Sequence, residues 1–268
     1  MMAYTESQKA QFETDGYIVL PGLLTAEEIT RLREASKAHL HAHAVFVDGG
    51  TTQMDAFNHV PEVRWLPTHP KVLEAFHYFC GDQLEYCHHS DIHMNKFTGW
   101  HRDNHGKNDW APGADGQPFA VYKMAAYLQD HSRGPTALYV VPGSHRTNAD
   151  TGAPVAELRP AIGDVVLFDI RIKHKGEENS LFGKILKRIS PSRALTTRIL
   201  QGMRSMQGAP EKMSVFFTYG LPNERTREHV DLTIERQLRQ SGEQKYELAN
   251  DLRSQLTDAG IIVRDKAA

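Results

Sequence analysis

The chain has 268 residues, a formal net charge of −2 and a sequence pI near 6.7. A chain of this length can bury a sizeable core as one domain, and its near-neutral charge gives no general attraction to nucleic acid or to an anionic membrane. No apolar run approaches the ~20 residues that a membrane-spanning helix needs. Two cysteines are too few for a disulfide framework, and the first residues lack the basic and apolar stretches of a leader. We therefore expect a cytoplasmic protein that acts on a small molecule.

The N-terminal third combines one short strand with helical segments. Residues 16–22 are apolar and end in Pro-Gly, which predicts a short buried strand closed by a turn. Thr25 and Glu28 then form a capping-box pattern, which predicts that a helix begins here. Residues 45–60 are rich in Gly, Thr, Asp and Asn and are expected to form a loop. Residues 69–80 have helical periodicity and are followed by a glycine.

From residue 83 the pattern changes to short runs of β-branched, aromatic and aliphatic residues that are separated by turns. This pattern indicates an antiparallel sandwich or barrel. The expected strands span residues 84–97, 119–128, 137–141, 165–173 and 213–219, and a polar loop spans 104–117.

The tail from residue 223 to 259 is charged and compatible with helix. Leu248, Leu252 and Leu256 recur every four residues, so they would share one helical face. That face either packs on the outside of the core or forms a homodimer contact, and both alternatives stay open.

A metal site is suggested by the segment Trp-His-Arg-Asp at residues 100–103. On an extended segment, His101 and Asp103 would point to the same side. The motif alone is weak, because chance predicts about one His-x-Asp in a chain of this composition. The chain has three, and the other two are at residues 89–91 and 229–231, where we expect structural or solvated side chains.

A second histidine completes a known ligand set. His174 ends an apolar run, and strand alternation over residues 165–174 would place it on the inward face with Val166 and Phe168, while Asp169 points outward. A lone histidine on such a face is more often a hydrogen-bonded core residue. Together with His101 and Asp103, however, it makes the two-histidine, one-carboxylate set of non-haem Fe(II) oxygenases.

Several blocks in this order resemble the phytanoyl-CoA dioxygenase family of Fe(II)/2-oxoglutarate oxygenases. They are residues 16–24, 100–103, 127–130 with 134–145, and 163–174. The resemblance implies a mainly β fold with flanking helices, a double-stranded β-helix or jelly roll, and iron bound by His101, Asp103 and His174. We expect a single domain over residues 1–268. It would comprise a helical N-terminal part (1–82), a jelly-roll core (83–222) with an insert (175–211), and a helical tail (223–268).

The sequence departs from the family pattern after His174. The family places an arginine about ten residues further on, where it binds the far carboxylate of 2-oxoglutarate. Here Lys212 leads the next clear strand, so we expect it to be the anchor, with Arg193 and Arg198 as the next candidates. A lysine would bind the carboxylate as a point charge, without the two parallel hydrogen bonds that an arginine offers. An equally good interpretation is that Lys212 is a solvated lysine at the end of a strand.

The insert 175–211 carries seven cations and three carboxylates. Its charges would steer an anionic substrate, or the insert is a mobile loop that covers the site.

The resemblance implies an oxygenase that uses Fe(II), 2-oxoglutarate and O2 and yields succinate. Related halogenases replace the carboxylate ligand by a small residue, so Asp103 favours hydroxylation, desaturation or ring formation. Two alternatives remain: a jelly-roll metalloenzyme that does not use 2-oxoglutarate, and a non-catalytic binding module.

Overall fold

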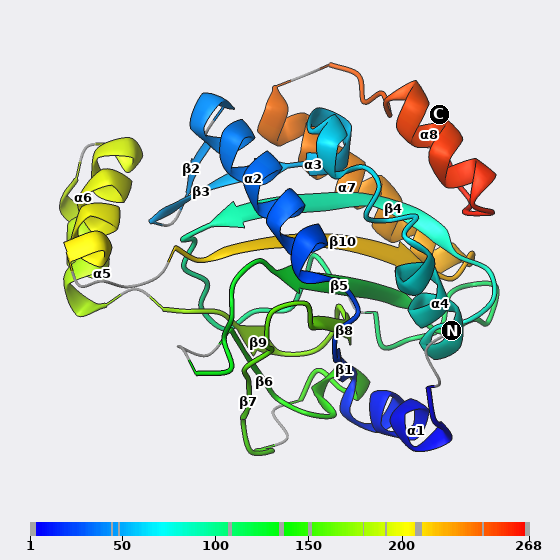
Figure 1. Ribbon diagram of the computed structural model, residues 1–268. Coiled ribbons are helices and arrows are strands. Elements are labelled where there is room, and N and C mark those ends of the chain that lie inside the picture. Colours follow the sequence, from blue (N-terminus) through cyan, green and yellow to red (C-terminus); the bar gives the residue numbers. More distant parts are fainter. Residues whose placement is uncertain are drawn as a thin grey trace.

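A seven-stranded antiparallel sheet forms the centre of the molecule, and a three-stranded sheet lies against part of one of its faces (Figure 1). The computed structural model describes residues 4–43, 45–47, 49–106, 109–133, 137–149, 152–178, 180–190, 192–206, 211–242 and 244–265. The strands are β1 (Tyr17–Leu20), β2 (Val45–Val47), β3 (Gly50–Met54), β4 (Glu85–Met94), β5 (Val121–Tyr127), β6 (Leu138–Val140), β7 (Ala156–Leu158), β8 (Val165–Asp169), β9 (His174–Lys175) and β10 (Met213–Gly220). The large sheet has the order β1-β8-β5-β10-β4-β3-β2, and the small sheet has the order β7-β6-β9. The mainly β fold with two sheets is thus confirmed.

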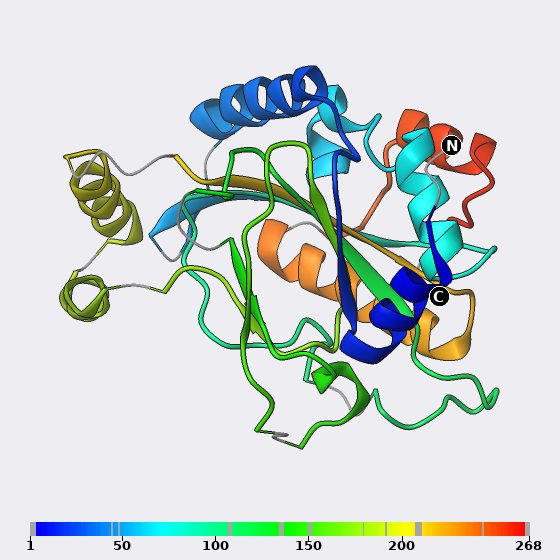
Figure 2. The same cartoon turned by 60° about the horizontal axis from the view of Figure 1, so that its bottom comes forward.

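Helices cover the face of the large sheet that is turned away from the small sheet (Figure 2). The helices of the described residues are α1 (Glu6–Asp15), α2 (Ala26–His43), α3 (Ala56–His59), α4 (Pro70–Phe79), α5 (Leu181–Ile189), α6 (Arg193–Met206), α7 (Glu224–Ser241) and α8 (Asn250–Asp258), with 3-10 turns η1 (Pro61–Val63) and η2 (Ser144–Arg146). Of these, α1, α2, α3, α4 and α8 contribute to the larger core on this face, whereas α7 packs against β4. The capping box of α2 is present, because the Thr25 amide donates to Glu28 and the Glu28 amide donates to the Thr25 hydroxyl.

Strand alternation separates this core from the space between the sheets. On β8, Val165 and Leu167 belong to the helix-covered core, whereas Val166 and Phe168 pack toward the small sheet. Both faces of the strand are therefore buried, as its continuous apolar sequence requires.

A turn before β8 holds the N-terminal strand region to the core. Gly163 has a φ of +90°, and a Cβ there would lie 2.4 Å from the carbonyl oxygen of Leu24. Asp164 accepts hydrogen bonds from the amides of Gly22 and Ala161, each at 2.9 Å. The Gly-Asp pair is needed here because glycine permits the close approach and aspartate satisfies two loop amides.

Three expectations about secondary structure were wrong. Residues 45–60 form β2, β3 and α3 rather than a loop, since β3 pairs with β4. The strand expected to continue to residue 173 ends at Asp169, and Asp169 is buried against Arg171 instead of pointing outward. The described part of the insert contains helices α5 and α6, which lie at one end of the large sheet, where α6 contacts β2 and β3 (Figure 1).

The expected helical tail contains α7 and α8. Leu248, Leu252 and Leu256 are all buried in the core of the same chain, so the packing alternative describes them. A homodimer through the tail stays a prediction. In the part of the chain that the structure describes, no helix is both long and apolar enough to cross a membrane.

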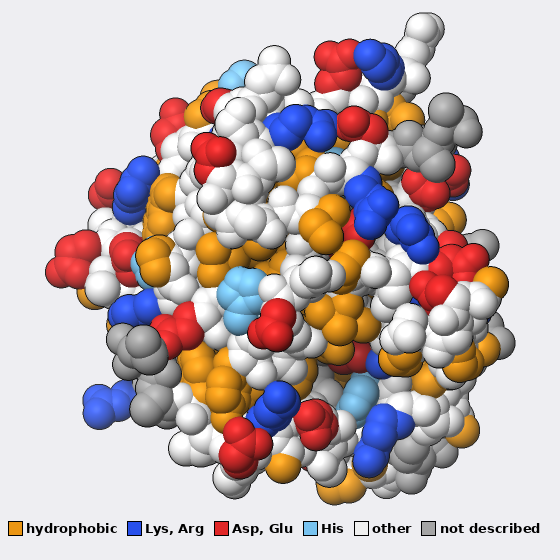
Figure 3. Space-filling view, turned by 90° about the vertical axis from the view of Figure 1, so that its right-hand side faces the viewer, with side chains coloured by type: hydrophobic (Ala, Val, Ile, Leu, Met, Phe, Trp, Pro, Cys, Tyr) orange, Lys and Arg blue, Asp and Glu red, His pale blue; other side chains and the backbone are white. Residues whose placement is uncertain are grey.

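Charges of both signs are interspersed on the face shown in Figure 3, which is the right-hand side of Figure 1. Apolar side chains lie between them, and no large area of this face carries charges of one sign only. This mixture agrees with the small net charge.

Candidate active site

The structure brings His101, Asp103 and His174 together. The backbones of the two histidines pair directly: the His101 amide donates to His174 at 2.9 Å, and the His174 amide donates to His101 at 3.0 Å. The Asp103 amide donates to the carbonyl of Ile170 at 2.9 Å, which continues the pairing. Between the two site residues, Arg102 donates to the backbone oxygen of Ser144 at 2.6 Å. The segment is therefore extended, and its alternation turns His101 and Asp103 toward His174.

The donor atoms of these three residues form a compact group. His101 Nε2 lies 3.5 Å from Asp103 Oδ1, and His174 Nε2 lies 3.5 Å from Asp103 Oδ2. One ligand atom from each residue lies within 4.8 Å of the others. Among the described residues, this is the group of three His, Cys, Asp or Glu side chains that is close enough to hold a metal ion. Two imidazole nitrogens and a carboxylate oxygen suit a first-row divalent metal, and the group leaves one side open.

Backbone carbonyls orient both imidazoles. His101 Nδ1 donates to the Gly99 carbonyl at 2.8 Å, and His174 Nδ1 donates to the Ile172 carbonyl at 3.0 Å. With the proton held on Nδ1, the lone pair of each Nε2 faces Asp103 and is free to bind a metal. Burial lowers the pKa of His174 to about 4, so this ring is neutral at pH 7. Burial also opposes protonation of His101, but the hydrogen bond and charge of Asp103 outweigh it and raise its pKa.

Lys123 on β5 forms an ion pair with the same carboxylate. Its Nζ lies 2.6 Å from Asp103 Oδ2, and only 9% of its side chain is exposed. Burial alone would raise the pKa of Asp103, yet Lys123 and the two histidines hold it well below its usual range. We did not predict Lys123 from the sequence. The available indication was that it is the only charged residue in the apolar run 119–128.

The group opens into a cavity of about 260 Å³ between the two sheets. Its apolar lining includes Tyr127, Leu138, Phe168 and Phe216. Such a mixture of apolar surface and a few convergent polar groups is typical of small-molecule sites.

The expected 2-oxoglutarate anchors lie in different places. Lys212 lines the cavity, and its buried Nζ lies 3.8 Å from Glu177 without a hydrogen-bond partner among the described residues. Burial lowers the pKa of Lys212, and the charge of Glu177 opposes this shift. Arg193 and Arg198 are exposed on α6 and do not line this cavity.

The structure narrows the interpretation of the other two His-x-Asp motifs, which we expected to be structural or solvated. His89 and Asp91 are not solvated, because they are buried on β4 and line the same cavity. His229 is a buried residue of α7 whose ring lies 4.9 Å from that of His105, and Asp231 borders a different pocket. Strand alternation could have shown that His89 and Asp91 share a face, but nothing local shows that this face borders the cavity.

The fold is that of a jelly-roll protein, and it holds a partly buried group of two imidazoles and one carboxylate that could bind a metal ion. The family model described as "Phytanoyl-CoA dioxygenase (PhyH)" matches residues 12–180. The chain therefore belongs to the phytanoyl-CoA dioxygenase family. Residues 134–136 of the central family block lie outside the described residues.

Comparisons with individual proteins agree with this assignment. The ectoine dioxygenase of Sphingopyxis alaskensis is 27% identical over 156 residues, which are 52% of this chain and 49% of that protein. The chain thus spans about half the length of the curated relative that it matches.

Solved structures share the fold at lower identity. The non-haem α-ketoglutarate-dependent epimerase SnoN from nogalamycin biosynthesis has a TM-score of 0.58 and 20% identity, covering 81% of this chain and 82% of its own. EctD from S. alaskensis, solved with 2-oxoglutarate and 5-hydroxyectoine, has a TM-score of 0.57 and 18% identity, covering 81% and 76%. HygX from Streptomyces hygroscopicus, solved with nickel and 2-oxoglutarate, has a TM-score of 0.55 and 16% identity, covering 82% and 88%.

Proposed function

We propose that this protein is an Fe(II)/2-oxoglutarate-dependent dioxygenase that hydroxylates, desaturates or cyclises a small molecule, as in specialised metabolism. The observation that carries the proposal is the compact group of His101, Asp103 and His174, with both imidazoles oriented by backbone carbonyls. Membership of the family and the ligands named for the structural neighbours support it.

The three residues fit a resident Fe(II) in their chemistry. His174 is neutral and buried, Asp103 is ionised, and each offers an atom toward the same point. Iron bound there, with 2-oxoglutarate and O2, would supply the oxidation of a substrate C–H bond coupled to conversion of 2-oxoglutarate to succinate and CO2. The chain's own part is to hold the metal on one side, orient the substrate and exclude water from the cavity.

Lys212 is our candidate for binding the far carboxylate of 2-oxoglutarate. Its ammonium is buried in the cavity lining and has no hydrogen-bond partner among the described residues, so a carboxylate there would satisfy it. Arg193 and Arg198 are less suitable because they are exposed on α6.

The experiment is anaerobic and uses a matched pair of motif variants. Purified protein is reconstituted with Fe(II), 2-oxoglutarate is added, and the weak visible charge-transfer band of a chelated 2-oxo acid is recorded. The variants are Asp103→Ala and Asp231→Ala, since both remove the carboxylate of a His-x-Asp motif but only Asp103 lies in the group. We expect the band in the wild type and in Asp231→Ala, and its loss together with bound iron in Asp103→Ala.

Other outcomes distinguish the alternatives. Iron bound without a band would favour a metalloenzyme that does not use 2-oxoglutarate. A wild-type protein that binds neither iron nor 2-oxoglutarate would contradict the proposal and favour a binding module on the same fold.

A further inference from the structure

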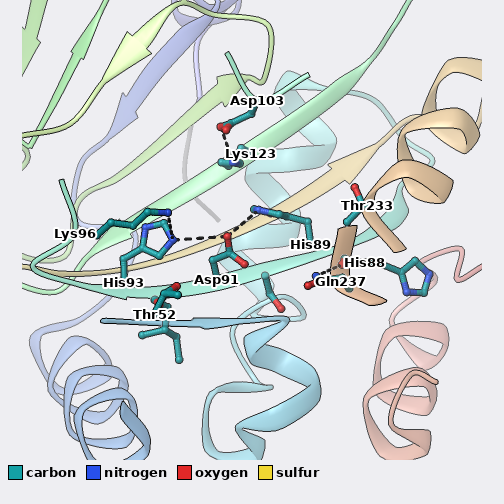
Figure 4. Close-up of polar contacts among 12 residues, drawn as sticks. Thr52, His88, His89, Asp91, His93, Lys96, Asp103, Lys123, Thr233 and Gln237 are labelled. Carbon is teal, nitrogen blue, oxygen red and sulfur yellow. Dashed lines mark hydrogen bonds and ion pairs between the residues drawn. The ribbon is translucent and has the colours of Figure 1, made fainter. Parts of the chain in front are cut away.

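A second polar wall lines the same cavity, beside the apolar side chain of Phe216. Its core is three alternating residues of β4, His89, Asp91 and His93, which the strand turns to the same side. Asp91 Oδ2 lies 3.3 Å from His89 Nε2 and 3.7 Å from His93 Nε2. Figure 4 shows Asp91 between the two rings, with Lys96 beyond His93. The proposed metal group does not use any of these side chains.

Polar atoms of this wall are buried without partners. Asp91 Oδ1 has no hydrogen-bond partner among the described residues, and neither do Nε and Nη2 of Arg236, which reaches the cavity from α7. An unsatisfied buried polar group costs free energy, and a charged one costs more. A ligand that carries both a hydrogen-bond donor and an acceptor would satisfy the carboxylate oxygen of Asp91 and these two guanidinium nitrogens of Arg236.

The charges of the wall are those of Asp91 and Arg236, because its histidines are neutral. Burial lowers the pKa of His89 and of His93 to about 4. Burial alone would raise the pKa of Asp91, but the hydrogen bond from His89 and the charge of Arg236 hold it well below its usual range. At pH 7 the wall therefore presents one carboxylate and one guanidinium.

The other cations of the cavity already have roles or partners. Lys123 is bonded to Asp103 at 2.6 Å, and Lys96 lies 3.3 Å from His93 Nε2. Lys212 is the candidate anchor for 2-oxoglutarate. Four cations and two carboxylates line the cavity, so it favours a ligand with negative charge. Arg236 is the cation that remains for the substrate, and its planar fork suits an oxyanion.

We propose that Arg236 binds an oxyanion of the substrate and that Asp91 accepts a hydrogen bond from a neighbouring amino or hydroxyl group. The substrate class is thus a small amino or hydroxy acid whose hydrocarbon part lies against Leu138, Phe168 and Phe216. This inference rests on the proposed oxygenase function and names the substrate chemistry of the same cavity.

The test measures binding of three matched probes to protein loaded with Fe(II) and saturating 2-oxoglutarate under anaerobic conditions. The probes are L-leucine, 4-methylpentanoate, which lacks the amine, and 3-methylbutylamine, which lacks the carboxylate. Calorimetry is done on the wild type, Arg236→Gln, Arg236→Lys, Asp91→Asn and Arg239→Gln. Arg239 is the matched control, because it is an exposed arginine on the same helix.

We expect the wild type to bind L-leucine most tightly and the amine most weakly. Arg236→Gln should weaken both acids at least tenfold, Arg236→Lys should weaken them less, and Arg239→Gln should leave them unchanged. Asp91→Asn should reduce L-leucine binding toward that of 4-methylpentanoate.

Three results would overturn the inference. Arg236→Gln could bind L-leucine and 4-methylpentanoate as tightly as the wild type does. The wild type could bind 3-methylbutylamine more tightly than the two acids, or it could bind neither acid. The charge-transfer band is recorded on the same samples and reports the proposed function separately. A band that persists in Arg236→Gln while acid binding is lost supports both, whereas a missing band in the wild type contradicts the proposed function itself.

Discussion

Lys123 is a cation in the interior of an apolar strand, and its partner is a residue of the proposed metal group. Removing it would leave the mostly buried Asp103 carboxylate without its cationic partner. We expect Lys123→Met to lower the free energy of unfolding of the metal-free protein by roughly 2–4 kcal/mol, allowing for the fifth of Asp103 that stays exposed. A divalent ion should restore part of this loss, since it supplies positive charge to the same carboxylate.

Urea unfolding with and without Zn(II) measures both effects. Lys175→Met is the control, because Lys175 forms a partly exposed pair with Glu178 and should matter by less than about 1 kcal/mol. A Lys123→Met protein as stable as the wild type would show that the buried pair contributes nothing.

Lys212 is the proposed anchor for the far carboxylate of 2-oxoglutarate, and it lines the same cavity. We expect Lys212→Ala to weaken 2-oxoglutarate binding about 10- to 100-fold, the range for loss of a charged hydrogen bond of roughly 1.5–3 kcal/mol. The measurement is a titration of the charge-transfer band in the wild type, Lys212→Ala and Arg198→Ala. An equal loss in Arg198→Ala would move the anchor to α6.

Among the helices, α8 of the C-terminal tail and α5 of the insert differ in how deeply their apolar side chains are buried. Leu252 on α8 is fully buried in the main core, whereas Ile189 at the end of α5 is 71% exposed. Leu252→Ala should therefore cost about 2–5 kcal/mol of unfolding free energy. Ile189→Ser should change it by no more than about 0.5 kcal/mol.

Chemical denaturation of both variants tests this contrast. A large loss in Ile189→Ser would mean that another surface covers the apolar side of α5 in solution. A small loss in Leu252→Ala would mean that the tail is not part of the cooperative unit.

At the scale of the whole molecule, buried neutral histidines link stability to pH. Burial lowers the pKa of His88, His89 and His93 to about 4, below the value near 6.5 in an unfolded chain. Below about pH 6.5 these histidines bind protons in the unfolded state but stay neutral in the folded state. The free energy of unfolding should therefore be greatest above about pH 6.5 and should fall as the pH decreases toward 4. Each such histidine contributes about 1 kcal/mol per pH unit in this window.

Urea midpoints at pH 7.5 and 5.5 provide the measurement, and we expect a loss of several kcal/mol at the lower pH. Replacing His88, which lies outside the cavity lining, by Gln should reduce this slope. A stability that is flat across the window would show that these rings are protonated in the folded protein.

Local periodicity and motif order predict several features of this protein from its amino-acid sequence. Capping of α2, the apolar strands β5 and β10, and the pairing of His101 with Asp103 on one side of an extended segment all follow from neighbouring residues. The family blocks added the fold, because their order reflects the order of strands in a jelly roll.

Which faces meet depends on contacts between segments that are distant in the sequence. Alternation on β4 indicates that His89, Asp91 and His93 share a side, but Arg236 reaches the same cavity from α7, which is distant in the sequence. The end of β8 at Asp169 could likewise not be predicted from neighbouring residues. The apolar sequence continues beyond it, but the buried ion pair of Asp169 with Arg171 and a turn end the strand there. Periodicity shows which residues point together, whereas non-local packing decides whether they face a core, a cavity or solvent.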